Sequence, residues 1–260
     1  MTSLAGRIGK AAAITFVAGT LGGAVLLATE AIVARTRKYA KPALGLALRA
    51  KVGPEGTPPL RLVLLGDSTA LGVGVDRLVD TIGGQLADLL SADGRQVVLS
   101  SVGVAGSRSS DLATQVARCL LGDRPDVALI LIGANDATGL RRPSDAAVYL
   151  GAAVRRLRDA GVEVVVGTCP DLGAVRAIAP PLRQIIAWLG RRVARAQVRA
   201  VHGAGGAVVD LGAETGPVFR ADPNTLCHDR YHPSADGYRV WAYALLPAVA
   251  HAAGVSPRLP

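Results

Sequence analysis

A serine and a histidine with an acidic neighbour are the side chains of this 260-residue chain best suited to chemistry. Ser68 follows Gly66 and Asp67 directly after an apolar run, and His232 lies three residues after Asp229. A serine hydroxyl becomes a nucleophile when a neighbouring base takes its proton, and an imidazole does this near neutral pH. A carboxylate can hold that imidazole in the useful tautomer. We therefore predict Ser68 as nucleophile, His232 as base and Asp229 as the orienting acid of an acyl-transfer site.

Acyl transfer also needs hydrogen-bond donors for the oxyanion, each typically worth roughly a hundred- to a thousand-fold in rate. We predict three such donors: the backbone N–H of Ser68, the backbone N–H of a glycine, and the side-chain amide of Asn135. A glycine lets the backbone approach the oxyanion without a side chain in the way. Gly103 and Gly106 are both candidates, and Gly106 is favoured because it lies further beyond the preceding apolar run.

The elements that must position these residues alternate along the chain from residue 60. Short apolar runs, partly β-branched and bounded by Gly, Pro or Asp, indicate strands buried on both faces. Helix-length segments separate them, which predicts a parallel sheet in a three-layer α/β/α fold with right-handed crossovers. The expected strands are 62–65, 97–99, 127–132, 162–166 and 207–209, and the expected helices are 80–92, 109–120, 144–160, 180–201 and one beginning near Ser234.

Ligands bind beyond the carboxyl ends of the strands in such sheets. The candidate residues follow the first three runs or precede the last helix, so we expect them to meet at that edge. Taken singly, Asp67-Ser68 also fits a helix N-cap or a turn, Asn135-Asp136 fits a turn, and His232 fits a loop before an N-cap at Ser234. Their joint occurrence in this order favours the site.

With these blocks in place, residues 60 to 250 resemble the SGNH/GDSL hydrolase family. Gly66-Asp67-Ser68 is similar to the first sequence block of the family, although Thr69 stands where leucine is usual. Gly133-x-Asn135-Asp136 is similar to the third block, and Asp229-x-x-His232 is similar to the fifth. The resemblance implies a flavodoxin-like sheet of five parallel strands in the order 2-1-3-4-5. It also implies hydrolysis of esters or thioesters through an acyl-enzyme on Ser68, with no metal and no cofactor.

Other activities fit less well. Gly66-Asp67-Ser68-Thr69-Ala70 is one residue short of the Gly-x-Ser-x-Gly elbow of α/β-hydrolases, and that fold needs several strands before its nucleophile. Gly72-Val73-Gly74 is not followed by the Gly-Lys-Ser/Thr of a phosphate-binding loop. Two alternatives stay open: acyl transfer to a sugar or lipid acceptor, and a membrane-tethered binding protein that keeps the fold without catalysis.

The N-terminal region differs from the rest of the chain. Residues 11–29 are uncharged and mostly apolar, with basic residues on both flanks, which predicts a membrane anchor over 1–41 that meets the membrane through residues 11–34. A signal peptide cleaved near Thr29-Glu30-Ala31 is the alternative. Four prolines in 42–59 indicate a linker, which leaves 60–260 as the hydrolase domain. The side of the membrane and the oligomeric state stay open.

The net charge of +9 is concentrated in the same region. Residues 1–52 hold eight Lys or Arg and one acid, so the other 21 basic and 19 acidic residues give only +2. We therefore expect no nucleic-acid partner. The three cysteines have neither disulfide-framework nor zinc-ligand spacing.

The substrate is expected to be a small-molecule ester or lipid. We expect the pocket walls to come from loops that follow the strands, over residues 72–80, 107–110, 137–143 and 170–181. The last of these loops is rich in apolar residues, which favours a short to medium acyl chain. An anchored site would lie near lipid, which favours the same conclusion.

Overall fold

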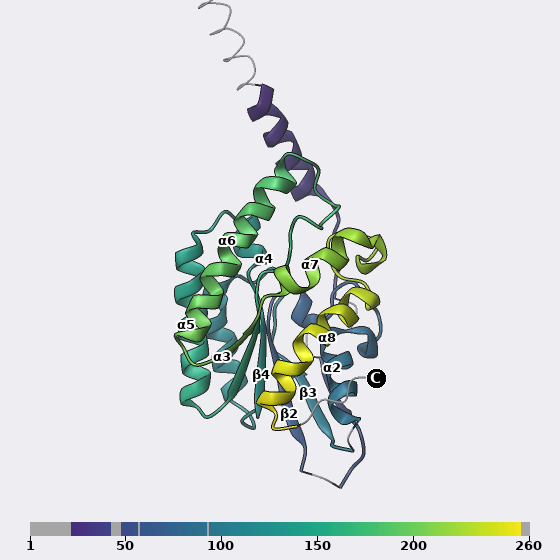
Figure 1. Cartoon of the computed structure of the whole chain (residues 1–260), viewed down its shortest axis with the longest axis vertical. Coiled ribbons are helices and arrows are strands. Elements are labelled where there is room, and N and C mark those ends of the chain that lie inside the picture. The colour runs from purple at the N-terminus through teal and green to yellow at the C-terminus, as the bar shows by residue number, and fades with distance from the viewer. Residues whose placement is uncertain (1–21, 43–47, 57, 93, 256–260) are drawn as a thin grey trace, which may run out of the picture.

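The computed structural model describes residues 22–42, 48–56, 58–92 and 94–255. A six-stranded sheet runs through the molecule in the order β1-β3-β2-β4-β5-β6 (Figure 1). The five strands expected from the sequence are present, pair in parallel, and follow the expected order. They are β2 (Leu60–Gly66), β3 (Val97–Ser101), β4 (Val127–Leu131), β5 (Glu163–Gly167) and β6 (Ala207–Val209).

The expectation of a five-stranded, wholly parallel sheet is wrong by one strand. β1 (Arg49–Val52) pairs antiparallel with β3, with Arg49 opposite Ser100. It lies within the segment 42–59 that was expected to be a linker, and Leu48 just before it is buried in the core. Charged and apolar residues alternate in β1, as befits an edge strand with one face against the protein and one face in water.

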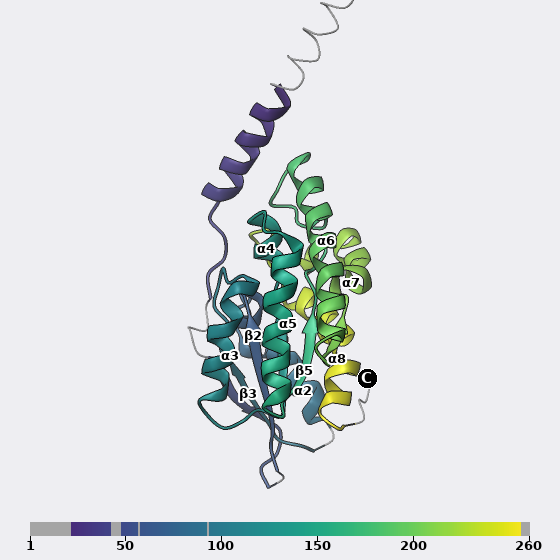
Figure 2. The same ribbon diagram turned by 90° about the vertical axis from the view of Figure 1, so that its left-hand side faces the viewer.

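Helices cover both faces of the sheet. The helices α2 (Ile82–Ser91) and α8 (Ala235–Ala252) pack on one face, and α3 (Leu112–Leu120), α5 (Pro143–Asp159) and α6 (Leu182–His202) pack on the other (Figures 1 and 2). Side chains of β2 alternate between the two cores, with Leu62 and Leu64 in one and Val63 and Leu65 in the other. This alternation follows from the pleat of a strand buried on both faces.

Two further helices were not predicted. The helix α7 (Leu211–Ala221) contains Pro217, Gly212 and Gly216, residues that weaken a helical pattern in sequence. The helix α4 (Ala134–Thr138) is only five residues long, and its N-cap is Gly133, which has a φ of 126°. Both lie at the carboxyl edge of the sheet, where they shape the candidate site.

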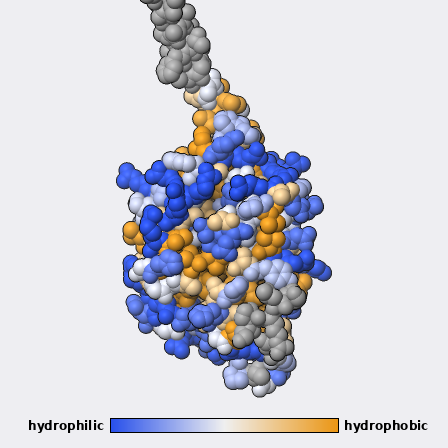
Figure 3. Space-filling model, in the orientation of Figure 1, coloured by the Kyte–Doolittle hydropathy of each residue, from blue (hydrophilic) through white to orange (hydrophobic). Residues whose placement is uncertain are grey.

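A helix over residues 22–36 extends away from the body of the molecule, at the end where α6 begins (Figures 1 and 2). Its apolar side chains are exposed, among them Val25, Leu26, Ile32 and Val33, and Figure 3 shows this apolar surface. Among the described residues, no helix has both the length and the apolar character needed to cross a bilayer. Residues 11–21, which make up much of the predicted membrane segment 11–34, lie outside the described part of the chain.

Candidate active site

The predicted nucleophile, base and acid form one hydrogen-bonded chain at the carboxyl edge of the sheet. Ser68 follows β2 in a turn, whereas Asp229 and His232 lie in the loop before α8. Ser68 Oγ is 3.0 Å from His232 Nε2, and His232 Nδ1 is 2.6 Å from Asp229 Oδ2. Asp229 and His232 are buried and Ser68 is half-buried. The structure therefore brings Ser68 together with two residues that lie more than 160 positions later in the sequence.

Asp229 is held as a carboxylate by its surroundings. Its Oδ1 accepts hydrogen bonds from the backbone N–H groups of Tyr231 (2.7 Å) and His232 (2.9 Å). Burial by itself would raise the pKa of Asp229, but the His232 side chain and the backbone N–H groups of Ala40, His232 and Tyr231 hold that pKa well below its usual value. An ionised Asp229 fixes the imidazole with its Nδ1 protonated, which leaves Nε2 free to accept the proton of Ser68.

Two contacts of Asp229 were missing from the sequence analysis. The thiol of Cys227 donates to Asp229 Oδ1 over 3.1 Å, and the backbone N–H of Ala40 donates to Oδ2 over 2.9 Å. Burial raises the pKa of Cys227 to about 12, so the thiol stays protonated and remains a donor. The spacing of Cys227 two residues before Asp229 was a usable signal. Nothing in the sequence marks Ala40, because a backbone N–H is common to almost every residue.

The turn that carries Ser68 is fixed by its neighbours. A Cβ atom at Gly66 would come 1.8 Å from the carbonyl oxygen of Leu131, and the φ of Gly66 is 135°, so only glycine fits there. Asp67 Oδ1 accepts from the N–H and the hydroxyl of Thr69, both at 2.9 Å. Thr69 therefore does more than replace the leucine usual at this position, since its hydroxyl helps to orient the buried Asp67.

Two buried glutamines tie the loops of the site together. Gln115 on α3 accepts from the N–H of Gly66 (2.7 Å) and donates to the carbonyl of Gly66 (2.9 Å) and the hydroxyl of Ser107 (3.1 Å). Gln197 on α6 donates to the carbonyl of Ile132 (2.9 Å) and accepts from the N–H of Cys169 (2.8 Å). These bonds satisfy buried backbone groups and hold neighbouring strand ends in a fixed relation.

The predicted oxyanion donors lie around the same edge. Asn135 Nδ2 donates to the carbonyl of Ser107 over 3.0 Å and lies 3.5 Å from Asp67 Oδ2. The N–H of Gly103 already donates to Ser101 Oγ, and Gly103 is buried, which argues against it as the donor. Gly106 is exposed with a φ of 81°, and its N–H and that of Ser68 bond to no other residue in the described part of the chain.

A small apolar cavity opens beside Ser68, His232 and Asn135. Its walls include Pro170, Leu172, Ala174 and Val175 from the loop after β5, together with Phe219, Leu226 and Trp241. Its volume is about 50 Å³, far below the roughly 300–1,000 Å³ of pockets for drug-sized ligands. Residues 170–181 were expected to form a pocket wall, and the first half of this loop does line the cavity. The expected walls from 72–80, 107–110 and 137–143 do not line this cavity.

The described residues include no ligand set for a metal ion. In the ranges that the structure describes, no group of three or more His, Cys, Asp or Glu side chains is placed to hold a metal ion. Cys119, Cys169 and Cys227 are all buried and unbridged.

Comparison with known proteins places these features in context. The model of the GDSL-like lipase/acylhydrolase family matches residues 64–240. A GDSL-like esterase of Mycobacterium tuberculosis is 44% identical over 193 residues, an alignment that covers 73% of this chain and 62% of that protein. This chain therefore matches about three fifths of its relative's length.

Solved structures show the same fold at lower identity. An acetylxylan esterase from Geobacillus stearothermophilus has a TM-score of 0.56 at 20% identity, and the match covers 76% of this chain and 97% of that one. A member of the lipolytic G-D-S-L family from Veillonella parvula has a TM-score of 0.59 at 16% identity, with 72% and 97% covered. A lipase/acylhydrolase from Enterococcus faecalis has a TM-score of 0.57 at 21% identity, with 77% and 100% covered.

Proposed function

Because this chain belongs to the GDSL-like lipase/acylhydrolase family, we propose that it hydrolyses carboxylic esters with Ser68 as the nucleophile. The observation that carries the proposal is the continuous hydrogen-bonded chain from Ser68 Oγ through His232 to Asp229, with both contacts at 3.0 Å or less. These distances are within the range that proton transfer requires of a nucleophile and its base.

The proposed reaction has two halves. His232 Nε2 takes the proton of Ser68 as Oγ attacks the ester carbonyl, and Asp229 stabilises the imidazolium that forms. The N–H groups of Ser68 and Gly106 and the amide of Asn135 donate to the oxyanion. His232 then gives its proton to the leaving alcohol, which leaves an acyl group on Ser68. A water molecule, activated by the same imidazole, releases the acid and restores the hydroxyl.

The cavity favours a short acyl group. Its volume of about 50 Å³ leaves little room beyond the carbonyl, and its apolar walls favour a hydrocarbon over a charged group. The full chain assayed on p-nitrophenyl acetate, butyrate, hexanoate and octanoate should give its highest kcat/KM for acetate or butyrate. A maximum at octanoate would contradict the short-acyl assignment, and no hydrolysis of any ester would favour the catalytically silent alternative. Products formed with a competing alcohol distinguish hydrolysis from acyl transfer.

The proposal also places the protein at a membrane. The uncharged run at 11–29 and the exposed apolar side chains of the helix over 22–36 support an anchor. The prediction is that the full chain stays with the membrane fraction after carbonate extraction, because a spanning segment is not released by high pH. Recovery of the chain in the supernatant would contradict the anchor.

Replacing Asn135 with Ala should lower kcat by roughly a hundred- to a thousand-fold with little change in KM, as expected on losing one oxyanion donor. One N–H of the amide donates to the Ser107 carbonyl over 3.0 Å, and the long 3.5 Å contact from Nδ2 to Asp67 Oδ2 is the one that an oxyanion would replace. Steady-state kinetics on p-nitrophenyl acetate measure the effect. Asn224→Ala, at an exposed asparagine away from the cavity, is the control. Equal activity of Asn135→Ala and wild type would show that Asn135 does not donate to the oxyanion.

A further inference from the structure

Residues 30–42, here called the N-terminal strap, comprise the end of the helix over 22–36 and the segment that runs from it to the edge of the sheet that carries the candidate site. Two bonds fix the strap to the loop before α6 and to the start of that helix. The N–H of Leu182 donates to Glu30 Oε2 over 2.9 Å, and Arg37 Nη1 donates to the carbonyl of Ala177 over 3.2 Å. The strap is therefore attached to the catalytic part of the molecule before it reaches the site.

The strap ends on the acid–base pair itself. The N–H of Ala40 donates to Asp229 Oδ2, the same oxygen that lies 2.6 Å from His232 Nδ1. The ring of Tyr39 lies edge-on to the rings of Tyr231 and His232, with centroids 5.0 Å and 6.4 Å apart. Its hydroxyl donates to the carbonyl of Ala34 within the strap over 2.9 Å. The strap thus supplies a donor to the carboxylate and an aromatic cover for the imidazole.

We infer that Tyr39 and Ala40 are positioning residues for Asp229 and His232, so that the segment next to the proposed anchor completes the active site. The inference rests on the proposed esterase function. Asp229 Oδ2 has two donors, one from His232 and one from Ala40, whereas Oδ1 is held by the Tyr231 and His232 N–H groups and the Cys227 thiol. Without the Ala40 donor, Oδ2 keeps only its bond to the imidazole, so the position of Oδ2 and of the imidazole is held less firmly.

Proline at position 40 tests the donor directly, because proline has no N–H. In the full chain, Ala40→Pro should lower kcat on p-nitrophenyl acetate by about ten- to a hundred-fold with KM nearly unchanged, the size of effect expected from a small misplacement of reacting groups. Ala40→Gly keeps the N–H and should retain most of the activity. Tyr39→Ala should lose about tenfold, whereas Tyr39→Phe, which keeps the ring, should stay close to wild type.

The outcomes separate this inference from the proposed function. Wild-type kcat in both Ala40→Pro and Tyr39→Ala would overturn the inference, and so would an equal loss in Ala40→Pro and Ala40→Gly. A loss that appears only in KM would also overturn it, since a positioning role acts on kcat. The proposed function fails instead if wild type is inactive or if Ser68→Ala keeps full activity. Thermal unfolding confirms that each variant is folded.

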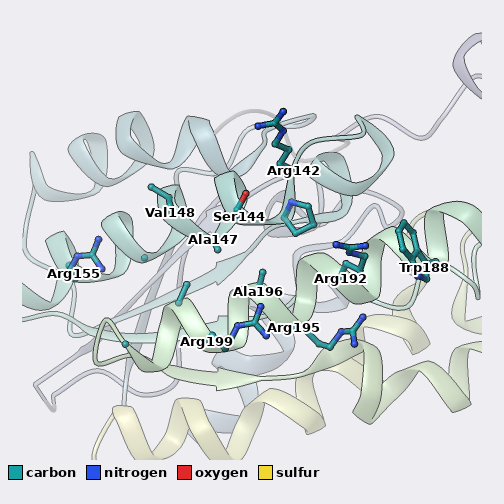
Figure 4. A pocket seen from close by; sticks show the side chains of 14 residues that line it. Arg142, Ser144, Ala147, Val148, Arg155, Trp188, Arg192, Arg195, Ala196 and Arg199 are labelled. Atoms are coloured by element: carbon teal, nitrogen blue, oxygen red, sulfur yellow. The ribbon is translucent and has the colours of Figure 1, made fainter.

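A separate groove lies on the outer face of the helix layer that contains α3, α5 and α6. The groove, of about 960 Å³, runs between α5 and α6 and is lined by five arginines (Figure 4). Arg142 and Arg155 come from the α5 side, and α6 contributes Arg192, Arg195 and Arg199. Between these rows, Ala147, Gly151, Ala196, Ala200 and Gly203 are among the small residues that line the groove.

These five arginines have no acidic partner in the part of the chain that the structure describes. No lining residue is acidic, and none of the five takes part in an ion pair with another described residue. Arg158, on the same helix as Arg155, does pair with Glu163. Five permanent positive charges around one groove repel one another, and a bound anion would relieve that repulsion. Guanidinium groups also match the oxygen geometry of phosphate.

One end of the groove has the character of a membrane interface. Trp188 lies in the second turn of α6 and is 47% exposed, with the Arg192 guanidinium 4.7 Å from its ring centroid. Ile185 one turn earlier is also exposed. The start of α6 is bonded to Glu30 in the helix over 22–36, whose apolar side chains are exposed. Tryptophan beside basic residues is typical of the level of lipid headgroups.

We propose that the α5–α6 groove binds the phosphate of anionic phospholipid headgroups. Tryptophan emission should report on lipid binding in the groove, since Trp188 is exposed whereas the second tryptophan, Trp241, is buried. The full chain in dodecyl maltoside, titrated with dihexanoyl phosphatidylglycerol, should give a saturable change. Dihexanoyl phosphatidylcholine should bind much more weakly, and inorganic phosphate should compete only at high concentration, which distinguishes the lipid headgroup from the free ion.

Two variants with equal charge loss decide the site. The triple variant Arg192→Gln, Arg195→Gln and Arg199→Gln should weaken phosphatidylglycerol binding by at least about tenfold, as expected on losing charge-assisted hydrogen bonds. The control Arg118→Gln, Arg124→Gln and Arg156→Gln removes exposed arginines outside the groove and should stay within about twofold. The unfolding temperature of the groove variant should not fall below that of wild type, because its substitutions remove the repulsion between the arginines of the groove. Equal binding of both lipids, equal weakening in both variants, or tighter binding of a short oligothymidylate would overturn the proposal.

Discussion

Ser68→Ala should abolish ester hydrolysis, with kcat reduced by roughly 10⁴- to 10⁶-fold. The only side-chain bond of Ser68 to another described residue runs from Oγ to His232 Nε2, so the substitution removes the nucleophile and leaves the oxyanion donors and the cavity in place. KM should therefore change little. Stability should change by less than about 0.5 kcal/mol, because Ser68 is half-buried and the truncation opens no core cavity.

Ser110→Ala is the matched control, since Ser110 is exposed and lies in the short 3-10 helix Ser109–Asp111 between β3 and α3. It should leave kcat and KM unchanged. A fluorophosphonate that labels active serines should add one covalent group to wild type and none to Ser68→Ala, as intact mass would show. Full labelling of Ser68→Ala would place the nucleophile elsewhere, and Ser107, whose hydroxyl accepts from Gln115, would be substituted next.

Asp229→Asn should lower kcat by roughly 10⁴-fold, through the wrong tautomer of His232. Three backbone N–H groups and His232 Nδ1 all point at the two carboxylate oxygens of Asp229. An asparagine must turn its NH₂ group toward one side. If the NH₂ faces His232, Nδ1 becomes the acceptor and the proton moves to Nε2, which then cannot accept from Ser68. If it faces Tyr231 and the His232 backbone, two donors lose their acceptor.

The same substitution should destabilise the fold. Leaving a buried donor without a partner costs about 1–3 kcal/mol. Because hydrogen bonds hold the pKa of Asp229 below its usual value, the stability that the carboxylate contributes is fully present above the unfolded pKa of about 3.9 and is lost as the pH falls further. The difference in unfolding free energy between wild type and Asp229→Asn should therefore shrink in acid.

Asp236→Asn is the control for this experiment. Asp236 is exposed in the first turn of α8, and Arg239 is its one ion-pair partner among the described residues, so its substitution should change stability by less than about 1 kcal/mol and leave kcat intact. An Asp229→Asn variant with wild-type kcat would show that His232 needs no carboxylate, and a gap in stability that stays constant down to low pH would show that Asp229 is not the titrating group.

The amino-acid sequence by itself determined the layered architecture and the main candidate residues. Runs such as 62–65 and 127–132 are apolar throughout and short, as expected of strands buried on both faces, and their alternation with helices predicts that those strands are parallel. Parallel strands end at one edge, so residues that directly follow them must lie close together. Ser68 and Asn135 could be placed beside each other for this reason, before any distance was known.

Only the tertiary structure decided what reaches that edge from elsewhere. β1 pairs with a strand about fifty residues away, and its alternating pattern and nearby prolines resemble a linker as much as an edge strand. The arginine groove draws its charges from two helices whose packing no local pattern reports. Ala40 meets Asp229 across 189 residues through a backbone N–H, a group that every residue except proline carries. The residue types of a side-chain motif can be recognised in the sequence, whereas the role of a backbone donor depends only on the position that folding gives it.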